Sequence, residues 1–340
     1  MKFSFRSDYC ELAHPDILKA LSAVGNKQFV GYGLDEYSLR ASELIREKAN
    51  ALSADIHFIP GGTHANLIVI SSILRPFEAV IAPNTGHIFV HEAGAIEATG
   101  HKICTAPCVN GKLLAVDIES IVKEHDDEHM VSPRLVYISQ STETGTIYSK
   151  AELTEISDVC RKNDLLLFVD GARLGAAMNS HANDLSYADL VELADAFYIG
   201  GTKNGALYGE AVVIMNDIMK KDFRVILKQR GAMLSKGAAI GIQFEALFKD
   251  GLFDKLAQHA NAMASKMADG IQNAGYELMN PVVTNMLLPI FPTKVAEMVA
   301  ENYGCYEWKK TPDNTILRLV TSWATPESVI DEFIADLENI

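Results

Sequence analysis

The chain has 340 residues, 48% of them hydrophobic, so it can bury enough apolar surface for one large domain with a smaller one beside it. Its 44 acidic residues outnumber 30 basic ones, and no basic patch offsets the net charge of −14, which argues against nucleic acid or membrane partners. No apolar run approaches the ~18 residues of a membrane span, and charges appear too early for a signal peptide. We therefore expect a cytoplasmic protein.

The five cysteines are scattered, and none forms the Cys-x-x-Cys pair that is typical of zinc or redox sites. Their odd number also argues against a disulfide framework. We expect reduced thiols, most of them buried.

Short apolar or β-branched segments alternate with longer amphipathic ones between residues 54 and 215. This alternation predicts an α/β fold, with a largely parallel sheet covered by helices on both faces. The predicted strands are 56–59, 79–82, 103–106, 135–139, 165–170, 196–199 and 211–215. Helical spacing of apolar residues predicts helices at 116–125 and 151–162. Ligands collect at the carboxyl ends of such strands, so a residue such as Asp170 is well placed for binding.

After Gly231 the sequence changes to longer helical stretches, predicted at 238–247 and 252–274, and then to a short α+β unit. That unit has predicted strands near 286–290 and at 315–321, a helix at 294–302 and a final helix from Pro326. The predicted domains are an N-terminal arm (1–14), a large domain (15–248) and a small C-terminal domain (249–340).

Lys203 lies among glycines directly after an apolar strand, in Phe-Tyr-Ile-Gly-Gly-Thr-Lys-Asn-Gly. Glycines let the backbone and a ligand approach closely, and desolvation lowers the pKa of a lysine so that it becomes nucleophilic. Asp170 ends a second apolar strand, a usual place for the partner of a pyridinium nitrogen. Each segment alone fits a turn or a solvated loop about as well. Together they predict a Schiff-base lysine and its carboxylate partner in one site.

The segment Ile-Pro-Gly-Gly-Thr63 connects a strand to an apolar helix. The free amides at a helix start bind phosphate, so Gly62 and Thr63 are candidate phosphate ligands. The segment is neither a Walker loop nor a three-glycine dinucleotide fingerprint, which disfavours nucleotide binding. The alternative is an ordinary strand-to-helix turn with Thr63 as the N-cap.

His87 follows the strand predicted at 79–82, which should deliver it to the same sheet edge as Thr63. There it can lie against an aromatic ring or touch the reacting groups; otherwise it is a surface residue in a turn. His91 lies at the helical spacing of a metal-binding pair, but no third ligand accompanies it, so we expect no metal.

Two arginines are candidates for binding a carboxylate through the planar guanidinium group. Arg173 lies three residues after Asp170, and Arg318 lies in Ile-Leu-Arg-Leu-Val. A charge in that strand is costly if it faces a core without a partner. The alternative for Arg318 is an outward-facing strand position.

Taken in order, several segments resemble motifs of the low-specificity threonine aldolases of the β-eliminating lyase family, over nearly the whole chain. The segments are Arg6-Ser-Asp8, Gly31-Tyr-Gly-Leu-Asp-Glu-Tyr-Ser38, Pro60-Gly-Gly-Thr-His-Ala-Asn66, His87-Ile-Phe, Asp170-Gly-Ala-Arg173, Gly200-Gly-Thr-Lys-Asn-Gly205 and Arg318 before Ser322-Trp323. The resemblance implies the aspartate-aminotransferase-like fold, known as pyridoxal-phosphate fold type I. It also implies a seven-stranded, mostly parallel sheet in the large domain.

The resemblance further implies pyridoxal 5'-phosphate as cofactor, carried by Lys203, with Asp170 keeping the ring nitrogen protonated and His87 stacked on the ring. The expected cofactor-binding residues are Gly62, Thr63, His87, Asp170, Arg173 and Lys203. The expected substrate-binding residues are Ser7, Tyr32, Arg173 and Arg318. The expected catalytic residues are Lys203, His87, Asp170 and His129, the last near the substrate hydroxyl.

Tyr32 is expected to enter the site of a neighbouring subunit, which implies a homodimer or a dimer of dimers with shared active sites. The implied reaction is the cleavage of L-threonine, L-allo-threonine or a related β-hydroxy-α-amino acid to glycine and an aldehyde. Another pyridoxal-phosphate reaction on the same fold, such as transamination or β-elimination, is the alternative. A non-catalytic phosphometabolite-binding protein is the remote one.

Three departures from the family pattern put the side-chain preference of the substrate in doubt. The chain has Leu34-Asp-Glu where many relatives have Asp-Asp-Pro, Thr202-Lys-Asn where many have Ser-Lys-Gly, and Ser322 where a histidine is frequent.

Overall fold

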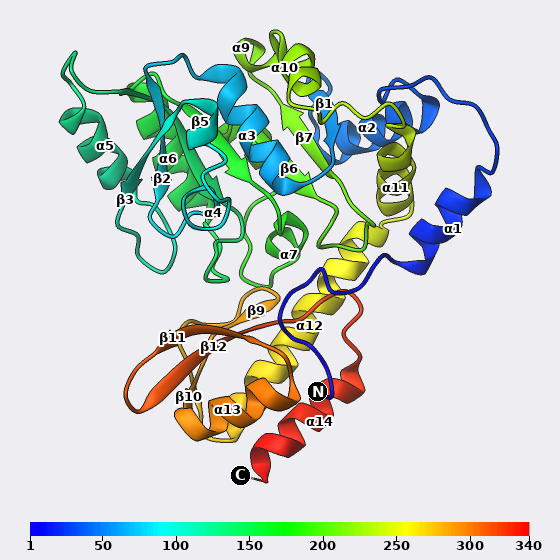
Figure 1. Ribbon diagram of the computed structural model, residues 1–340, viewed down its shortest axis with the longest axis vertical. Coiled ribbons are helices and arrows are strands. Elements are labelled where there is room, and N and C mark those ends of the chain that lie inside the picture. Colours follow the sequence, from blue (N-terminus) through cyan, green and yellow to red (C-terminus); the bar gives the residue numbers. More distant parts are fainter. Residues whose placement is uncertain (340) are drawn as a thin grey trace.

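The computed structural model describes residues 1–339, which form two sheets joined by a long helix (Figure 1). The larger sheet has the strand order β1-β7-β6-β5-β4-β2-β3. Its strands are β1 (Asp55–Ile59), β2 (Glu78–Pro83), β3 (Lys102–Ala106), β4 (Ser132–Ser139), β5 (Leu166–Asp170), β6 (Ala196–Gly200) and β7 (Glu210–Ile214). Strand β7 is antiparallel to both of its neighbours, and the other pairs are parallel. The predicted seven-stranded, mostly parallel sheet is confirmed.

Helices cover both faces of this sheet because successive strand residues point to opposite sides. In β4, Val136 and Ile138 enter one core while Leu135 and Tyr137 enter the other. The first core takes side chains from α1 (Pro15–Ala23), α2 (Glu36–Ala49), α5 (Ala115–Glu124), α6 (Lys150–Lys162), α7 (Leu174–Met178), α8 (Tyr187–Leu193) and α11 (Ala238–Lys249). The second core takes them from α3 (Gly62–Ile73), α4 (His87–Val90), α9 (Asp217–Lys220) and α10 (Phe223–Gln229). A 3-10 turn, η1, spans Glu97–Thr99.

The smaller sheet lies at the far end of the long helix α12 (Leu252–Asn273) and has its own apolar core (Figure 1). It has the order β11-β12-β10-β8, with β9 also paired to β12. Its elements are β8 (Glu277–Leu278), β9 (Met286–Leu287), β10 (Pro289–Pro292), α13 (Thr293–Asn302), β11 (Tyr306–Lys310), β12 (Asn314–Val320) and α14 (Glu327–Glu338). Helix α12 connects the cores, since Phe253 packs in the first and Met267 in that of the small sheet. The predicted boundary at residue 248 falls at the end of α11.

The N-terminal segment lies against this smaller sheet, beside the C-terminal helix (Figure 1). Phe5 is fully buried among residues of α12 to α14, and its carbonyl accepts a hydrogen bond from the backbone of Val320. Lys2 is paired with Asp336 on α14. The first residues of the chain therefore lie beside the C-terminal helix α14.

Two strands of the smaller sheet lack the apolar sequence pattern by which a strand can be predicted. Strand β11 reads Tyr-Glu-Trp-Lys-Lys and is mostly exposed, while β8 has only two residues. The strand predicted at 286–290 is divided into β9 and β10, which pair with different parts of β12. In the described residues no helix is long and apolar enough to cross a bilayer.

Candidate active site

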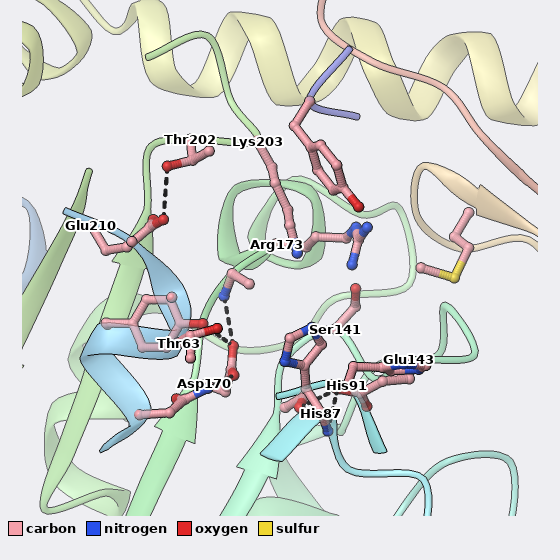
Figure 2. Close-up of a pocket in the computed structure, with 18 of the residues that line it drawn as sticks. Thr63, His87, His91, Ser141, Glu143, Asp170, Arg173, Thr202, Lys203 and Glu210 are labelled. Carbon is pink, nitrogen blue, oxygen red and sulfur yellow. Dashed lines mark hydrogen bonds between the residues drawn. The ribbon is translucent and has the colours of Figure 1, made fainter. Parts of the chain in front are cut away.

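A cavity of about 460 Å³ opens at the carboxyl ends of β5 and β6, facing the smaller sheet (Figure 2). The predicted residues that line it are Gly62, Thr63, His87, Asp170, Arg173, Lys203 and Arg318. They come from both sheets and from segments as far apart in the chain as Gly62 and Arg318. The cavity thus brings together most of the residues that the sequence nominated.

Lys203 lies in the tight loop between β6 and β7. A side chain at Gly201 would place its Cβ 2.7 Å from the carbonyl oxygen of Gly209, and one at Gly200 would meet Ala172 at 2.4 Å, so the loop requires both glycines. Burial lowers the pKa of the Lys203 ammonium, Arg173 lowers it further, and nearby carboxylates oppose the shift. The lysine therefore gives up its proton more readily than an exposed lysine does.

Asp170 ends β5 as a buried carboxylate with four hydrogen-bond donors. Its Oδ2 accepts from the Tyr137 hydroxyl at 2.6 Å and from Asn66 Nδ2 at 3.0 Å, and its Oδ1 accepts from the Tyr198 hydroxyl and the Ala172 amide. Burial would raise the pKa of Asp170, but His87 and these donors outweigh it and hold that pKa below its usual range. An ionised carboxylate is thus available to a ring nitrogen.

The sequence reasoning missed Asn66, Tyr137 and Tyr198. Each has a faint signal, because Tyr137 and Tyr198 carry hydroxyls inside otherwise apolar strands and Asn66 interrupts an apolar helix face. Buried polar atoms need partners, so such interruptions mark a polar network.

The phosphate candidate site is the start of α3. Gly61 is the N-cap and makes no side-chain cap bond, so the interpretation of Thr63 as a simple N-cap is wrong. Gly62 leaves room for close approach, since a Cβ there would lie 3.1 Å from the Tyr198 hydroxyl oxygen. The first amides of this 12-residue helix therefore face the cavity without a capping side chain.

The two arginines differ in their partners. Arg173 makes a bidentate pair with buried Asp8, with Nε 2.7 Å and Nη2 3.0 Å from its carboxylate oxygens. Arg318 lies over the ring of Tyr306 at 5.1 Å, and its buried Nε has no hydrogen-bond partner among residues 1–339. Burial followed by the charge of Arg173 lowers the pKa of Arg318. Arg318 lines the cavity and is the arginine still free to receive a carboxylate.

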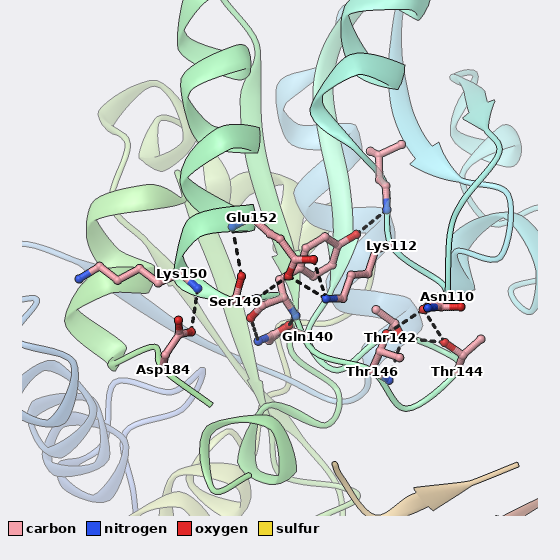
Figure 3. A network of polar contacts seen from close by, with 12 residues as sticks. Asn110, Lys112, Gln140, Thr142, Thr144, Thr146, Ser149, Lys150, Glu152 and Asp184 are labelled. Carbon is pink, nitrogen blue, oxygen red and sulfur yellow. Dashed lines mark hydrogen bonds and ion pairs between the residues drawn. The ribbon is translucent and has the colours of Figure 1, made fainter. Parts of the chain in front are cut away.

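The loop after β4 forms one wall of the cavity and contributes Ser141 and Glu143. Figure 3 shows how polar contacts hold it: the hydroxyls of Thr144 and Thr146 each donate to the carbonyl of Asn110 at 2.8 Å. Burial raises the pKa of Glu143, and Asp170 raises it further. The loop thus keeps a weakly acidic carboxyl close to the site.

Glu210, which the sequence reasoning also missed, holds the loop that carries the lysine. Its carboxylate accepts from the amide of Gly201 at 2.9 Å and from the hydroxyl of Thr202 at 2.8 Å (Figure 2). Burial raises the pKa of Glu210 to about 7. Its only sequence signal is an acid at the start of an apolar strand.

This raised pKa predicts a pH-dependent stability. Between about pH 4.5 and 7 the unfolded chain ionises Glu210 while the folded protein keeps it protonated, so folding stability falls as the pH rises through that window. A glutamine side chain cannot titrate. From pH 4.5 to 7.5 the free energy of unfolding of cofactor-free Glu210→Gln should therefore rise relative to that of the wild type by on the order of 2–3 kcal/mol. Urea unfolding of both proteins across this range measures it. The same substitution at exposed Glu97 is the control, and a constant difference between wild type and Glu210→Gln would refute the assignment.

Three predicted residues do not line the cavity of their own chain. His129 lies in an exposed turn before β4, and that strand's eight residues place it roughly 25 Å from the carboxyl edge of the sheet. His129 therefore does not reach the cavity of its own chain, and its role near the substrate hydroxyl stays a prediction. Ser7 is buried, with its hydroxyl 3.3 Å from Cys10 Sγ. The ring of Tyr32 lies 4.8 Å from the Lys228 ammonium, outside the cavity. The role of Tyr32 in a neighbouring subunit stays a prediction.

His91, first considered only as half of a metal pair, lines the cavity beside His87, with ring centroids 5.5 Å apart. Burial lowers the pKa of His91, and the neighbouring His87 imidazole lowers it further. Among residues 1–339 no three His, Cys, Asp or Glu side chains gather as a metal site.

The cavity residues fit pyridoxal phosphate: Lys203 for its aldehyde, Asp170 for its ring nitrogen and the start of α3 for its phosphate. The sheet order and this arrangement define a pyridoxal-phosphate enzyme of fold type I. Comparison with known proteins supports this fold. An aspartate aminotransferase from Thermus thermophilus, only 14% identical, shares the fold with a TM-score of 0.72 over 97% of this chain and 89% of its own.

Closer relatives narrow the class. The model of the β-eliminating lyase family matches residues 5–292. A low-specificity L-threonine aldolase from Pseudomonas sp. is 30% identical over 99% of this chain and 97% of its own length. The solved structure of a threonine aldolase from Leishmania major is 47% identical, with a TM-score of 0.97 over 99% of each chain. The chain belongs to the β-eliminating lyase family.

Proposed function

We propose that the protein is a pyridoxal-phosphate-dependent carbon-carbon lyase that cleaves L-threonine, L-allo-threonine or a related β-hydroxy-α-amino acid to glycine and an aldehyde. The observation that carries this is the guanidinium of Arg318, whose buried Nε has no hydrogen-bond partner among residues 1–339, in the same cavity as Lys203 and Asp170. A carboxylate bound there holds an amino acid with its α-carbon beside the cofactor. The names of the Pseudomonas and Leishmania relatives support the reaction.

The side chains of the cavity have separate tasks. Arg318 binds the substrate carboxylate, while Arg173, already paired with Asp8, forms the adjoining wall. The bound cofactor supplies an electron sink for the bond that breaks. Asp170 stabilises positive charge at the ring nitrogen, and a histidine of the cavity accepts the β-hydroxyl proton. His87 is the better placed for this, because a buried carboxylate orients its ring.

The test incubates the cofactor-loaded protein with L-threonine and with L-allo-threonine and assays acetaldehyde and glycine. Equal amounts of the two products are expected, and the two rates give the preference at the β-carbon. A 3-hydroxy-2-oxo acid without ammonia would instead indicate transamination, and 2-oxobutanoate with ammonia would indicate β-elimination. Either result without acetaldehyde would overturn the proposed reaction.

We further propose a homo-oligomer in the cytoplasm, with Tyr32 entering the site of a neighbouring subunit. Exposed apolar side chains cluster in sequence around Tyr32, at Val30, Leu34 and Leu39, as expected of a covered surface. All five cysteines are free thiols, which suits a reducing compartment. Light scattering that gave the mass of a single chain would contradict the oligomer.

A further inference from the structure

Glu92 joins two residues of the candidate site. It follows α4, its side chain is 0% exposed, and its Oε1 lies 2.8 Å from His87 Nδ1 and 2.7 Å from Asn66 Nδ2. Asn66 Nδ2 is also 3.0 Å from Asp170 Oδ2. One chain of hydrogen bonds therefore runs from His87 through Glu92 and Asn66 to Asp170 (Figure 2 shows the two end residues).

The positions of the protons follow from these contacts. The amide of Asn66 is oriented because its nitrogen faces two carboxylate oxygens, and the flipped amide would place its own oxygen against both. Glu92 Oε1 therefore accepts a hydrogen bond from Asn66. The same oxygen acts as an acceptor toward His87, so Nδ1 of His87 is the donor. In the neutral imidazole this leaves Nε2 with the lone pair.

Two buried polar atoms in this hydrogen-bonded network also favour a functional role for Glu92. Glu92 Oε2 and Asn66 Oδ1 are both buried and have no hydrogen-bond partner among the described residues. Burying such atoms without partners destabilises the folded state. A fold that needed Glu92 only for packing would be better served by an apolar side chain of the same size.

We propose that Glu92 and Asn66 are positioning residues that hold His87 in the Nδ1-protonated tautomer, with Nε2 as the acceptor of the substrate β-hydroxyl proton. The second part rests on the proposed function, and the first does not. In the reaction, the O–H bond of the hydroxyl breaks and an Nε2–H bond forms. The former O–H electrons complete the aldehyde carbonyl, and the Cα–Cβ electron pair goes to the cofactor. The Glu92 carboxylate offsets the positive charge that develops on the imidazole.

Other charged or titratable groups face His87 from the neighbouring elements. Glu143 accepts a hydrogen bond from the His87 backbone amide at 3.2 Å, and the His91 ring packs at 5.5 Å. Asp170 also lies close enough for His87 to lower the pKa of its carboxyl. Only Glu92 bonds to the ring of His87 itself, among residues 1–339, so substitution of Glu92 tests the tautomer directly.

The experiment records 15N spectra of the histidine-labelled, cofactor-loaded protein, with the His87 signals assigned from His87→Gln. Wild type should have a protonated Nδ1 and an unprotonated Nε2. Glu92→Leu removes the acceptor with an apolar side chain of one heavy atom fewer and should shift His87 toward the Nε2-protonated tautomer, which an unconstrained imidazole prefers. Retention of the Nδ1-protonated form in Glu92→Leu would overturn the proposal, whatever reaction the enzyme catalyses.

Glu92→Gln is the second variant, because its carboxamide oxygen can still accept from Nδ1. We expect it to keep the wild-type tautomer and fold but to lose the charge, with kcat lowered about 10-fold and KM nearly unchanged. Glu92→Leu should lower kcat by about 10²–10³-fold. Glu97→Gln, on the exposed turn that follows, is the matched control. Equal effects of Glu92→Gln on kcat and on cofactor affinity would indicate a structural role and overturn the proposal.

Discussion

Replacement of Lys203 by alanine should lower turnover of threonine by more than about 10³-fold, because the covalent attachment of the cofactor and the amine of the lysine are lost together. The purified variant should also lack the visible absorption band of the attached cofactor. The chain should still fold, since the side chain of Lys203 lines the cavity wall, with its ammonium 5.9 Å from the Tyr9 ring. Absorption spectra and product assays measure both effects.

The matched control is Lys294→Ala, which removes an exposed lysine from α13, far from the cavity. It should leave the spectrum and the rate unchanged. A Lys203→Ala enzyme that retained both the band and the rate would exclude this residue as the attachment site. Retention of the rate alone would exclude covalent participation.

Asp170→Asn should retain the fold and part of the cofactor affinity while turnover falls by about 10²–10⁴-fold. The carboxylate would face the ring nitrogen of a bound cofactor, and hydrogen bonds from Tyr137, Tyr198 and Asn66 stabilise its negative charge. A neutral amide there no longer stabilises the protonated ring, so the electron sink weakens. The substitution also turns an acceptor into a donor opposite donors, and we expect about 1–3 kcal/mol of lost stability.

The loss of stability has to be separated from the loss of catalysis. Urea unfolding and cofactor titration of Asp170→Asn give the first, and steady-state rates at saturating cofactor give the second. Asp164→Asn makes the same change at a side chain that is 94% exposed and should alter neither. Unchanged turnover in a folded, cofactor-saturated Asp170→Asn enzyme would reject the electrostatic role.

Much of the large domain could be predicted because its signals are local. A buried parallel strand is a short apolar run, and all seven runs appear as strands within three residues of their predicted bounds. Because the carboxyl ends of parallel strands meet at one edge, Asp170 and the loop of Lys203 were expected to lie together, and both line the cavity. Strand β11 escaped prediction because its charged, exposed residues carry no apolar alternation.

The distant members of the site could not be found in this way. Asp8 meets Arg173 across 165 residues of chain, and Asn66 meets Asp170 across 104. Such contacts depend on how the N-terminal segment returns to the cavity and on which turn of α3 faces β5. His129 lies in a turn before β4, so it does not reach the cavity of its own chain, and its predicted role depends on contacts that a single chain does not contain.

The sequence by itself determined the fold class, the lysine and aspartate of one site, and the glycine-rich start of α3, because each depends on residues close together in the chain. The tertiary structure alone decided which charges are paired. Among residues 1–339, Asp8 pairs with Arg173 while the buried Nε of Arg318 has no hydrogen-bond partner. Hydrogen bonds through Glu92 and Asn66 connect His87 to Asp170. The reason is physical: hydrogen bonds and ion pairs act over about 3 Å, and only packing decides which distant side chains come that close.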